Sequence, residues 1–182
     1  MIDTNSATKE NSICIIGTNN NVSSQFRLKG YNVSQYGRNT DPEIDFNSTK
    51  TNEMIKLIVD SQIGNKYIIL SGFLQSKKIL NQTKDEIINS IFVNSIGPTL
   101  FSEYLLNTNP NARLIIIGSE SGYKGSYDLT YALSKSSLRM YVKQKRTKPN
   151  QQLLLISPST IIDFGMTERR LDIQKLNQYR IN

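Results

Sequence analysis

The sequence contains no histidine, although it has 182 residues. This absence excludes acid–base catalysis by histidine, Ser-His-Asp chemistry and any metal site that uses histidine ligands. Because the chain also has a single cysteine, Cys14, we expect no zinc site and no other metal site. Any catalysis must therefore rest on tyrosine, lysine, serine, asparagine, arginine or carboxylate side chains.

Disulfides and long apolar segments are missing as well. One cysteine cannot form an internal disulfide, and this scarcity fits a reducing compartment. The longest strongly apolar runs, LIII and LLLI, are far too short to span a bilayer. The N-terminal stretch MIDTNSATKENS is polar and lacks the apolar region of a signal peptide. We therefore expect a cytoplasmic protein without a membrane partner.

Negative charge is in short supply, with 15 Asp and Glu against 22 Lys and Arg and a net charge of +7. Such a balance predicts an anionic partner, either nucleic acid or a phosphorylated small molecule. The densest basic run, KQKRTK at 143–148, is interpreted as a solvated helix end, where cations suit the helix dipole. No aromatic residues are interleaved with this run, so we expect no nucleic-acid partner.

Short apolar segments alternate along the chain with segments of helical spacing. Several apolar segments are continuous runs of isoleucine and leucine, which is typical of strands buried on both faces of a parallel sheet. The expected strands are 13–16, 32–36, 43–46, 67–70, 113–117 and 152–156, and the expected helices are 21–29, 49–62, 83–106 and 127–146. This α/β alternation predicts one Rossmann-like domain over residues 1–182, a doubly wound parallel sheet of about six strands with helices on both faces.

Local signals mark several helix ends. Gly30 follows the first predicted helix, where a C-cap glycine is favoured. Ser48 or Thr49 is expected to cap the N-terminus of the second helix, and Ser126 that of the last one.

In a doubly wound sheet the ligand binds at the carboxyl ends of the strands. This rule selects the loops Gly17–Ser23, Gly37–Asn39, Ser71–Phe73, Gly118–Gly122 and Ser157–Thr160. We expect the functional loop residues to lie in these segments.

Five motifs follow one another in order along the predicted elements. They are GTNNNVS after the first strand, VNSIG in the central helix, GSESG after strand 113–117, YALSK in the next helix and SPST after the last strand. In this order the chain resembles the short-chain dehydrogenase/reductase family, from about residue 12 to about residue 166. The segment EIDF, 43–46, also looks like the family's third strand, whose aspartate contacts adenine, which implies that Asp45 and Phe46 bind the cofactor.

The resemblance implies catalytic roles for Asn94, Ser119, Tyr131 and Lys135. A carbonyl that receives hydride at carbon needs a proton at oxygen, and free tyrosine, with a pKa near 10, exchanges protons poorly at neutral pH. Lys135 lies one helical turn after Tyr131 on the same face, and its charge lowers that pKa. Ser119 would hold the substrate oxygen, and Asn94 would anchor a water that links Lys135 to solvent.

These assignments have alternatives. Tyr141 and Lys145 also match Y-x-x-x-K, but they fall in the charged end of the helix. Ser121 competes with Ser119, and the gap from Ser119 to the tyrosine is one residue shorter than is usual in the family. Asn94 can instead hydrogen-bond a backbone carbonyl.

The end of the second strand reads YGRN, without the carboxylate that usually bonds the ribose 2′-hydroxyl of NAD. Arg38 stands there, and its planar guanidinium suits a 2′-phosphate, so we predict NADP, with NAD less favoured. Asp41 is expected to lie outside reach of the ribose. The residues predicted to bind the cofactor are Gly17, Thr18, Asn21, Val22, Arg38, Asp45, Phe46, Ser71, Gly72, Tyr131, Lys135 and Pro158.

The family's glycine-rich turn, G-x-x-x-G-x-G, keeps Gly17 here and has Asn21 and Ser23 at its other two positions. Asparagine tolerates positive φ better than most residues, so Asn21 is expected to preserve the backbone shape. Ser23 is small enough for helix–strand packing, and hydroxyls of Thr18, Ser23 and Ser24 can donate to phosphate at the helix N-terminus. We expect weakened or reoriented cofactor binding.

The predicted function is an NADP-dependent carbonyl reductase or alcohol dehydrogenase that acts on a small carbonyl or hydroxyl substrate. Family members continue through a substrate-binding loop, another helix and a seventh strand, whereas this sequence ends soon after Pro158 and Ser159, which replace the usual Pro-Gly. The alternative is a non-catalytic dinucleotide-binding or cofactor-sensing protein of the same fold. The expected assembly is a homodimer or homotetramer.

Overall fold

The computed structural model describes residues 11–159 apart from 63 and 76. The polar stretch before residue 11, Thr160 and the charged tail lie outside the described residues. The strands are β1 (Ser12–Ile16), β2 (Asn32–Tyr36), β3 (Lys66–Ile69), β4 (Arg113–Ile117) and β5 (Gln152–Ile156). The helices are α2 (Asn20–Leu28), α3 (Thr51–Ser61), the 3₁₀ turn η1 (Ile79–Asn81), α4 (Lys84–Ile91), the π-helical segment η2 (Phe92–Ile96), α5 (Gly97–Thr108), α6 (Ser121–Lys124) and α7 (Leu129–Gln144).

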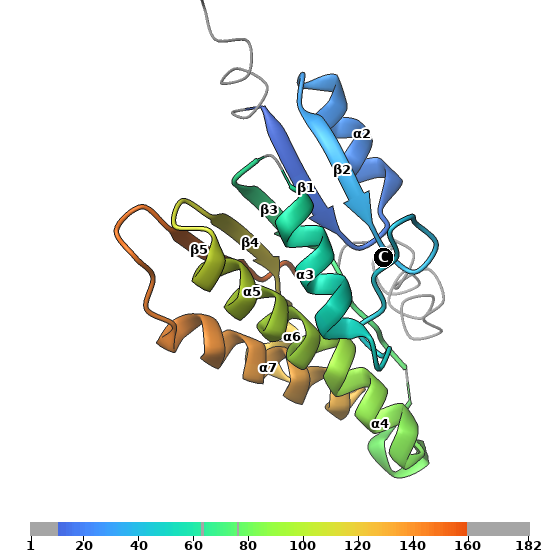
Figure 1. The fold of residues 1–182 in the computed structure, drawn as a ribbon. Coiled ribbons are helices and arrows are strands. Elements are labelled where there is room, and N and C mark those ends of the chain that lie inside the picture. Colours follow the sequence, from blue (N-terminus) through green and yellow to red (C-terminus); the bar gives the residue numbers. More distant parts are fainter. Residues whose placement is uncertain (1–10, 63, 76, 160–182) are drawn as a thin grey trace, which may run out of the picture.

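All five strands join one parallel sheet in the order β2-β1-β3-β4-β5 (Figure 1). β1 pairs with β2 and β3, so that Ile15 aligns with Gln35 and Ile68. β3 and β4 are in turn aligned at Ile69 and Ile116. The side chains of Ile15, Ile69 and Ile116 are fully buried, because β1 and β3 are buried on both faces and β4 is buried on the face that carries Ile116.

The predicted strand 43–46 is wrong, and the described residues form a five-stranded sheet. These residues belong to the loop between β2 and α3. The backbone N–H of Ile44 donates to the Gly37 carbonyl at 3.1 Å, so the loop closes on the end of β2. Phe46 is buried beneath Gly97, where a Cβ would lie 2.3 Å from the phenylalanine ring. The alternating apolar residues of EIDF therefore anchor a loop.

Helices cover both faces of the sheet, as predicted, but unequally (Figure 1). α3, α5 and α7 lie side by side over one face, and α2 packs behind β2 on the other. The right-handed crossover requires this arrangement, because β2 and β3 lie on opposite sides of β1. The core between the sheet and the three-helix layer includes Ile55, Ile58, Phe101, Leu105 and Leu138.

The helix ends agree with the sequence in one case and differ in two. Gly30, with φ of +82°, follows the C-terminus of α2 as predicted. No side chain caps the start of α3, so neither Ser48 nor Thr49 has that role. Asp128 rather than Ser126 caps α7. Among the described residues, none of the helices combines the length and the apolar character needed to cross a membrane.

Candidate active site

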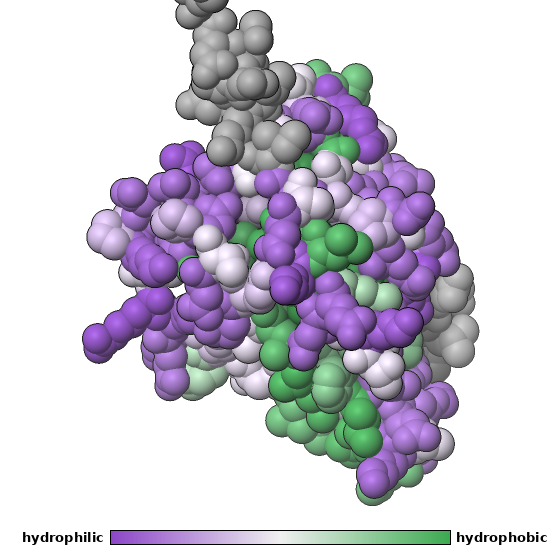
Figure 2. Space-filling model, in the orientation of Figure 1, coloured by the Kyte–Doolittle hydropathy of each residue, from purple (hydrophilic) through white to green (hydrophobic). Residues whose placement is uncertain are grey.

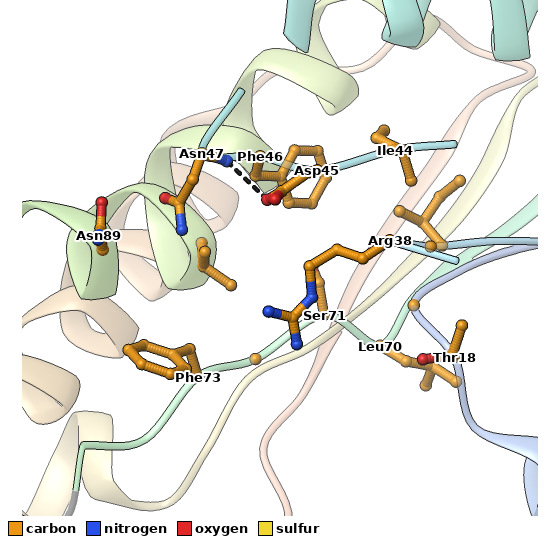
Figure 3. Close-up of a pocket in the computed structure, with 15 residues that line it drawn as sticks. Thr18, Arg38, Ile44, Asp45, Phe46, Asn47, Leu70, Ser71, Phe73 and Asn89 are labelled. Atoms are coloured by element: carbon orange, nitrogen blue, oxygen red, sulfur yellow. Dashed lines mark hydrogen bonds between the residues drawn. The ribbon is translucent and has the colours of Figure 1, made fainter. Parts of the chain in front are cut away.

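A pocket with a volume of about 410 Å³ opens at the carboxyl ends of β1, β2 and β3 (Figure 3). This size is within the range of small-molecule sites. The predicted cofactor residues that line it are Gly17, Thr18, Arg38, Asp45, Phe46, Ser71 and Gly72. The predicted cofactor residues outside its lining are Asn21, Val22, Tyr131, Lys135 and Pro158. The pocket therefore corresponds to the part of the predicted site formed by the first three strands.

Two glycines let the loops of this pocket approach one another. Gly17 has φ of +111°, and a Cβ there would lie 2.9 Å from the backbone nitrogen of Ser71. A Cβ on Gly37 would lie 2.6 Å from the methyl group of Thr18. Side chains at these positions would push the three loops apart, so both glycines are required by close approach, and Gly17 also by its backbone conformation.

The asparagines at 19–21 have a different backbone arrangement from the one that the sequence predicted. Asn21 is the second residue of α2 and therefore helical, so it does not supply the positive φ expected of it. Asn19 is the N-cap, and its side-chain oxygen accepts a hydrogen bond from the Val22 N–H at 3.0 Å. Ser23 is buried, as its small size predicts, and its hydroxyl donates to the Asn20 carbonyl. The asparagines thus saturate one of the N–H groups that a phosphate would use.

Arg38 extends from the loop after β2 into the pocket. Thr40 fixes this loop, because its hydroxyl accepts from the Gly37 N–H at 2.9 Å and lies 2.8 Å from the Pro42 carbonyl. Figure 3 shows the Arg38 guanidinium in the space between Asp45 and Phe73. Asp45 itself accepts a hydrogen bond from its neighbour's backbone, the Asn47 N–H. The pocket therefore carries a cation at the position where the sequence predicted one.

Asn94 supports the loop that follows β3. Its amide oxygen accepts from the Phe73 N–H at 2.8 Å, and its amide nitrogen donates to the Phe73 carbonyl at 2.6 Å and to Ser90 Oγ at 3.2 Å. Asn94 is completely buried in the π-helical segment η2. These contacts match the alternative of backbone hydrogen bonding. Next to this brace, Ser71 Oγ is buried without a hydrogen-bond partner among the described residues.

Tyr131 and Lys135 lie together at the start of α7. Both are buried, with exposed fractions of 8% and 3%. Lys135 Nζ is 5.8 Å from the centroid of the Tyr131 ring and donates to the Ile117 carbonyl at 3.1 Å. Burial lowers the pKa of Lys135 to about 8. The i, i+4 spacing of the sequence therefore becomes an adjacent phenol and ammonium, held against the end of β4.

The second Y-x-x-x-K pair forms no comparable arrangement. Lys145 forms an ion pair with Glu103 at 2.6 Å. Burial raises the pKa of Tyr141, whose hydroxyl has no hydrogen-bond partner among the described residues. Both residues lie near the C-terminal end of α7, away from the carboxyl edge of the sheet where α7 begins. Only the pair Tyr131 and Lys135, which the sequence context also favoured, therefore lies at the carboxyl edge of the sheet.

Ser119 and Pro158 lie on neighbouring loops at the carboxyl ends of β4 and β5. Ser119 Oγ accepts a hydrogen bond from the Ser121 N–H at 3.2 Å, and the Pro158 carbonyl accepts from the Glu120 N–H at 2.9 Å. A Cβ on Gly122 would lie 2.9 Å from the backbone of Lys135. The loop after β4 is therefore packed tightly against the helix that carries Tyr131 and Lys135.

Phe73, at the end of the predicted loop Ser71–Phe73, also lines the pocket, whereas sequence reasoning missed Asn47, Asn89 and Val93. Asn89 and Val93 are four residues apart and precede Asn94, so helical spacing from that motif was a usable signal. Phe73 follows Gly72 directly. Asn47 had no such signal, because its place depends on the loop fold of residues 43–46. No group of metal-ligating side chains occurs within the described part of the chain.

No protein-family model matches the sequence, and no curated protein matches it significantly. A short-chain dehydrogenase from Burkholderia cenocepacia, solved with NADP, has a TM-score of 0.73 at 13% identity, over 88% of this chain and 76% of that one. A short-chain dehydrogenase from Leptospira borgpetersenii, solved with NAD⁺, has a TM-score of 0.71 at 17% identity, over 86% and 73%.

A third similar structure is the aldohexose dehydrogenase of Thermoplasma acidophilum in its ligand-free form, with a TM-score of 0.71 at 15% identity, over 97% of this chain and 74% of that one. The element order and the parallel sheet place the chain in the Rossmann-like α/β class. Within that class, it has the fold of short-chain dehydrogenase/reductase proteins. The resemblance inferred from the sequence motifs is thus confirmed at the level of the fold.

Proposed function

We propose that this chain is a divergent short-chain dehydrogenase/reductase that uses NADP(H) and interconverts a small carbonyl compound and its alcohol. The observation that carries the proposal is the buried Tyr131–Lys135 pair beside the carboxyl end of β4. A buried lysine next to a tyrosine has a cost in stability that a purely structural helix avoids. Solved proteins of the same fold hold NAD⁺ or NADP, which supports a dinucleotide here as well.

Each of the candidate residues has a chemical task in this proposal. Tyr131 donates the proton to the carbonyl oxygen in reduction and accepts it in oxidation. Lys135, while charged, favours the phenolate and so lowers the pKa of Tyr131. Ser119 orients the substrate oxygen, and Asn94 holds the loop of Phe73 in place. When bound, the nicotinamide cofactor would supply or accept the hydride.

Several features of the pocket support binding of the adenosine half of a 2′-phosphorylated dinucleotide. Arg38 offers a guanidinium to a 2′-phosphate, and the buried Ser71 hydroxyl has an unused hydrogen-bonding capacity among the described residues. Gly17 lets the loop after β1 lie against the backbone of Ser71 at the edge of this pocket. Asp45 and Phe46 line the part of the pocket that we assign to adenine.

The test is a fluorescence titration with NADPH and NADH, followed by turnover assays on a panel of carbonyl compounds. Binding of NADPH together with turnover is the expected result. If neither cofactor binds, the proposal fails. If NADPH binds without turnover, the second candidate function is favoured, a cofactor-sensing protein of the same fold. The capped turn at Asn19 is the observation that favours this candidate, because it leaves one fewer donor for phosphate.

Replacing Arg38 by alanine should weaken NADPH binding by about 10- to 100-fold, the size of one hydrogen-bonded charge contact. NADH affinity should change far less, because NADH lacks the 2′-phosphate. Arg146→Ala is the matched control, since it removes the same charge from an exposed position just beyond the C-terminal end of α7. Calorimetric titration with both cofactors measures the ratio of the NADPH and NADH dissociation constants in each protein. Equal losses for NADPH and NADH would contradict the assignment of Arg38 to the 2′-phosphate.

Replacing Asn19 by glycine should tighten NADPH binding by about fivefold, because it frees the Val22 N–H for one additional hydrogen bond. Glycine is an adequate N-cap, so the loss in stability should be only a few tenths of a kcal/mol. Asn20→Gly, one residue further on, controls for added backbone freedom. Weaker binding in Asn19→Gly alone would mean that Asn19 shapes the turn for the cofactor instead of competing with it.

We also propose that the chain forms a homodimer or homotetramer. Figure 2 shows a hydrophobic area over α4 and α5. The exposed apolar residues that contribute to this surface are Ile88, Phe92, Ile96 and Leu100. Their spacing of four residues forms a stripe along one continuous helical rod, and such contiguous apolar surfaces mark interaction sites.

Replacing Leu100 by aspartate should weaken self-association at least about tenfold, since a charge would be buried at the interface. Sedimentation velocity should then show a shift toward the 20.7 kDa monomer. Leu57→Asp is the control, because Leu57 is exposed on α3, outside the stripe. A wild-type protein that sediments as a monomer at micromolar concentration would contradict the proposal.

A further inference from the structure

The segment after β3 is held by two buried side chains from different helices. Asn94 contacts both the N–H and the carbonyl of Phe73. Two residues further along, the Gln75 N–H donates to Asp128 Oδ2 at 2.9 Å. These contacts join one short stretch of backbone to η2 on one side and to the start of α7 on the other.

Asp128 makes more contacts than helix capping requires. Its Oδ1 accepts from the Tyr131 N–H at 3.1 Å, which is the capping bond, and from Gln82 Nε2 at 3.0 Å. Its exposed fraction is 1%. A serine would cap the helix equally well without burying a charge, and a buried carboxylate is costly unless it is fully hydrogen-bonded. Helix capping therefore explains Oδ1 of Asp128 but not Oδ2, which accepts the hydrogen bond from the Gln75 N–H.

The hydrogen bonds of Asp128 are significant because they join two parts of the proposed site. One end is the backbone N–H of Tyr131, the proposed acid–base residue. The other end is three residues beyond Gly72, which lines the cofactor pocket. Between the two, a single carboxylate spans from the loop of β3 to the helix of Tyr131.

We propose that Asp128 is a positioning residue that fixes Tyr131 relative to the segment after β3, and so sets the distance between the phenol and the carbonyl oxygen that exchanges the proton. The inference rests on the proposed function. Proton transfer needs the donor and acceptor within hydrogen-bonding reach, and a misplacement of about 1 Å can cost about 100-fold in rate. Asn94 and Asp128 together hold the same loop, so that the two sides of the site cannot move independently.

Two substitutions separate the link from the cap. Asp128→Asn keeps the shape and an oxygen for the Tyr131 N–H, but it turns an amide donor toward the Gln75 N–H. Asp128→Ser keeps a good N-cap and has no second oxygen. The matched control is Thr83→Ala, which removes the side-chain cap of α4 and its capping box without touching Gln75 or α7.

The first readout is amide hydrogen exchange on the protein without cofactor. In both Asp128 variants the Gln75 amide should exchange about tenfold faster, because it loses a hydrogen bond, while the Tyr131 amide stays protected. The second readout is kinetic: kcat should fall by about 10- to 100-fold, and the dissociation constant of NADPH should remain near the wild-type value. Thr83→Ala should change neither quantity.

The outcomes distinguish the inference from the proposed function. If Tyr131→Phe is impaired while both Asp128 variants keep the wild-type kcat, the positioning inference is overturned and the proposed function stands. An unchanged Gln75 exchange rate, or a loss confined to cofactor affinity, overturns the inference in the same way. If Tyr131→Phe turns over like wild type, or the wild type has no activity, the proposed function fails and the inference fails with it.

Discussion

Replacing Tyr131 by phenylalanine is expected to lower kcat by about 10²- to 10⁴-fold, the usual contribution of a positioned acid–base group. The substitution removes one oxygen from a ring that is 8% exposed, so it leaves the packing at the start of α7 almost unchanged. NADPH affinity should change little, because Tyr131 does not line the pocket formed by the first three strands. A loss in kcat with intact binding is the signature of an interaction used in the transition state.

Tyr141→Phe is the control for this experiment. Tyr141 belongs to the same helix and to the other Y-x-x-x-K match, and its hydroxyl is also buried. Its lysine partner in the sequence, Lys145, is instead paired with Glu103. We therefore expect full activity in Tyr141→Phe, measured by the oxidation of NADPH with the best substrate of the panel. Equal activity in the two variants would show that neither tyrosine transfers the proton.

The sequence predicted the frame of the site because that frame depends on local patterns. The runs ICII and YIIL become β1 and β3, and their carboxyl ends meet at the pocket as the rule for doubly wound sheets requires. Likewise, the four-residue spacing of Tyr131 and Lys135 suffices to place both on one face of a helix. These features can be predicted because they depend only on the periodic spacing of side chains in a helix or strand and on the order of the strands in the sheet.

The details that the sequence did not predict depend on contacts between distant segments. EIDF has the apolar alternation of a strand, but Phe46 finds its burial site under Gly97, about fifty positions away in the sequence, and the segment remains a loop. Asn19 and Asn21 have the same side chain, and their roles differ only because α2 begins between them. Asn19 is the N-cap, whereas Asn21 lies inside the helix. Both Ser126 and Asp128 are residue types that can cap α7, but only Asp128 also binds Gln75 and Gln82, which come from another part of the chain.

The burial of Lys135 leads to a second prediction, which concerns the dependence of stability on pH. Burial lowers the pKa of Lys135 from 10.5 to about 8, so the unfolded chain binds this proton more tightly than the folded one. Between pH 8 and pH 10.5 the unfolded state holds more protons, and the free energy of unfolding must therefore rise with pH. Lys135 alone contributes a slope of at most about 1.4 kcal/mol per pH unit in this window.

Lys135→Met removes this contribution and preserves most of the side-chain volume. The difference in the free energy of unfolding, wild type minus Lys135→Met, should therefore increase from pH 8 to pH 10.5, and groups common to both proteins should cancel. Urea unfolding at a series of pH values measures this difference, and Lys143→Met, at the exposed end of the same helix, is the control. Below pH 8 the wild type carries a charged ammonium at a site that is 97% enclosed, which is a cost in stability. The Lys135→Met protein should accordingly lose activity without losing stability at pH 7. If Lys135 only supported the fold, its replacement would instead lower the free energy of unfolding.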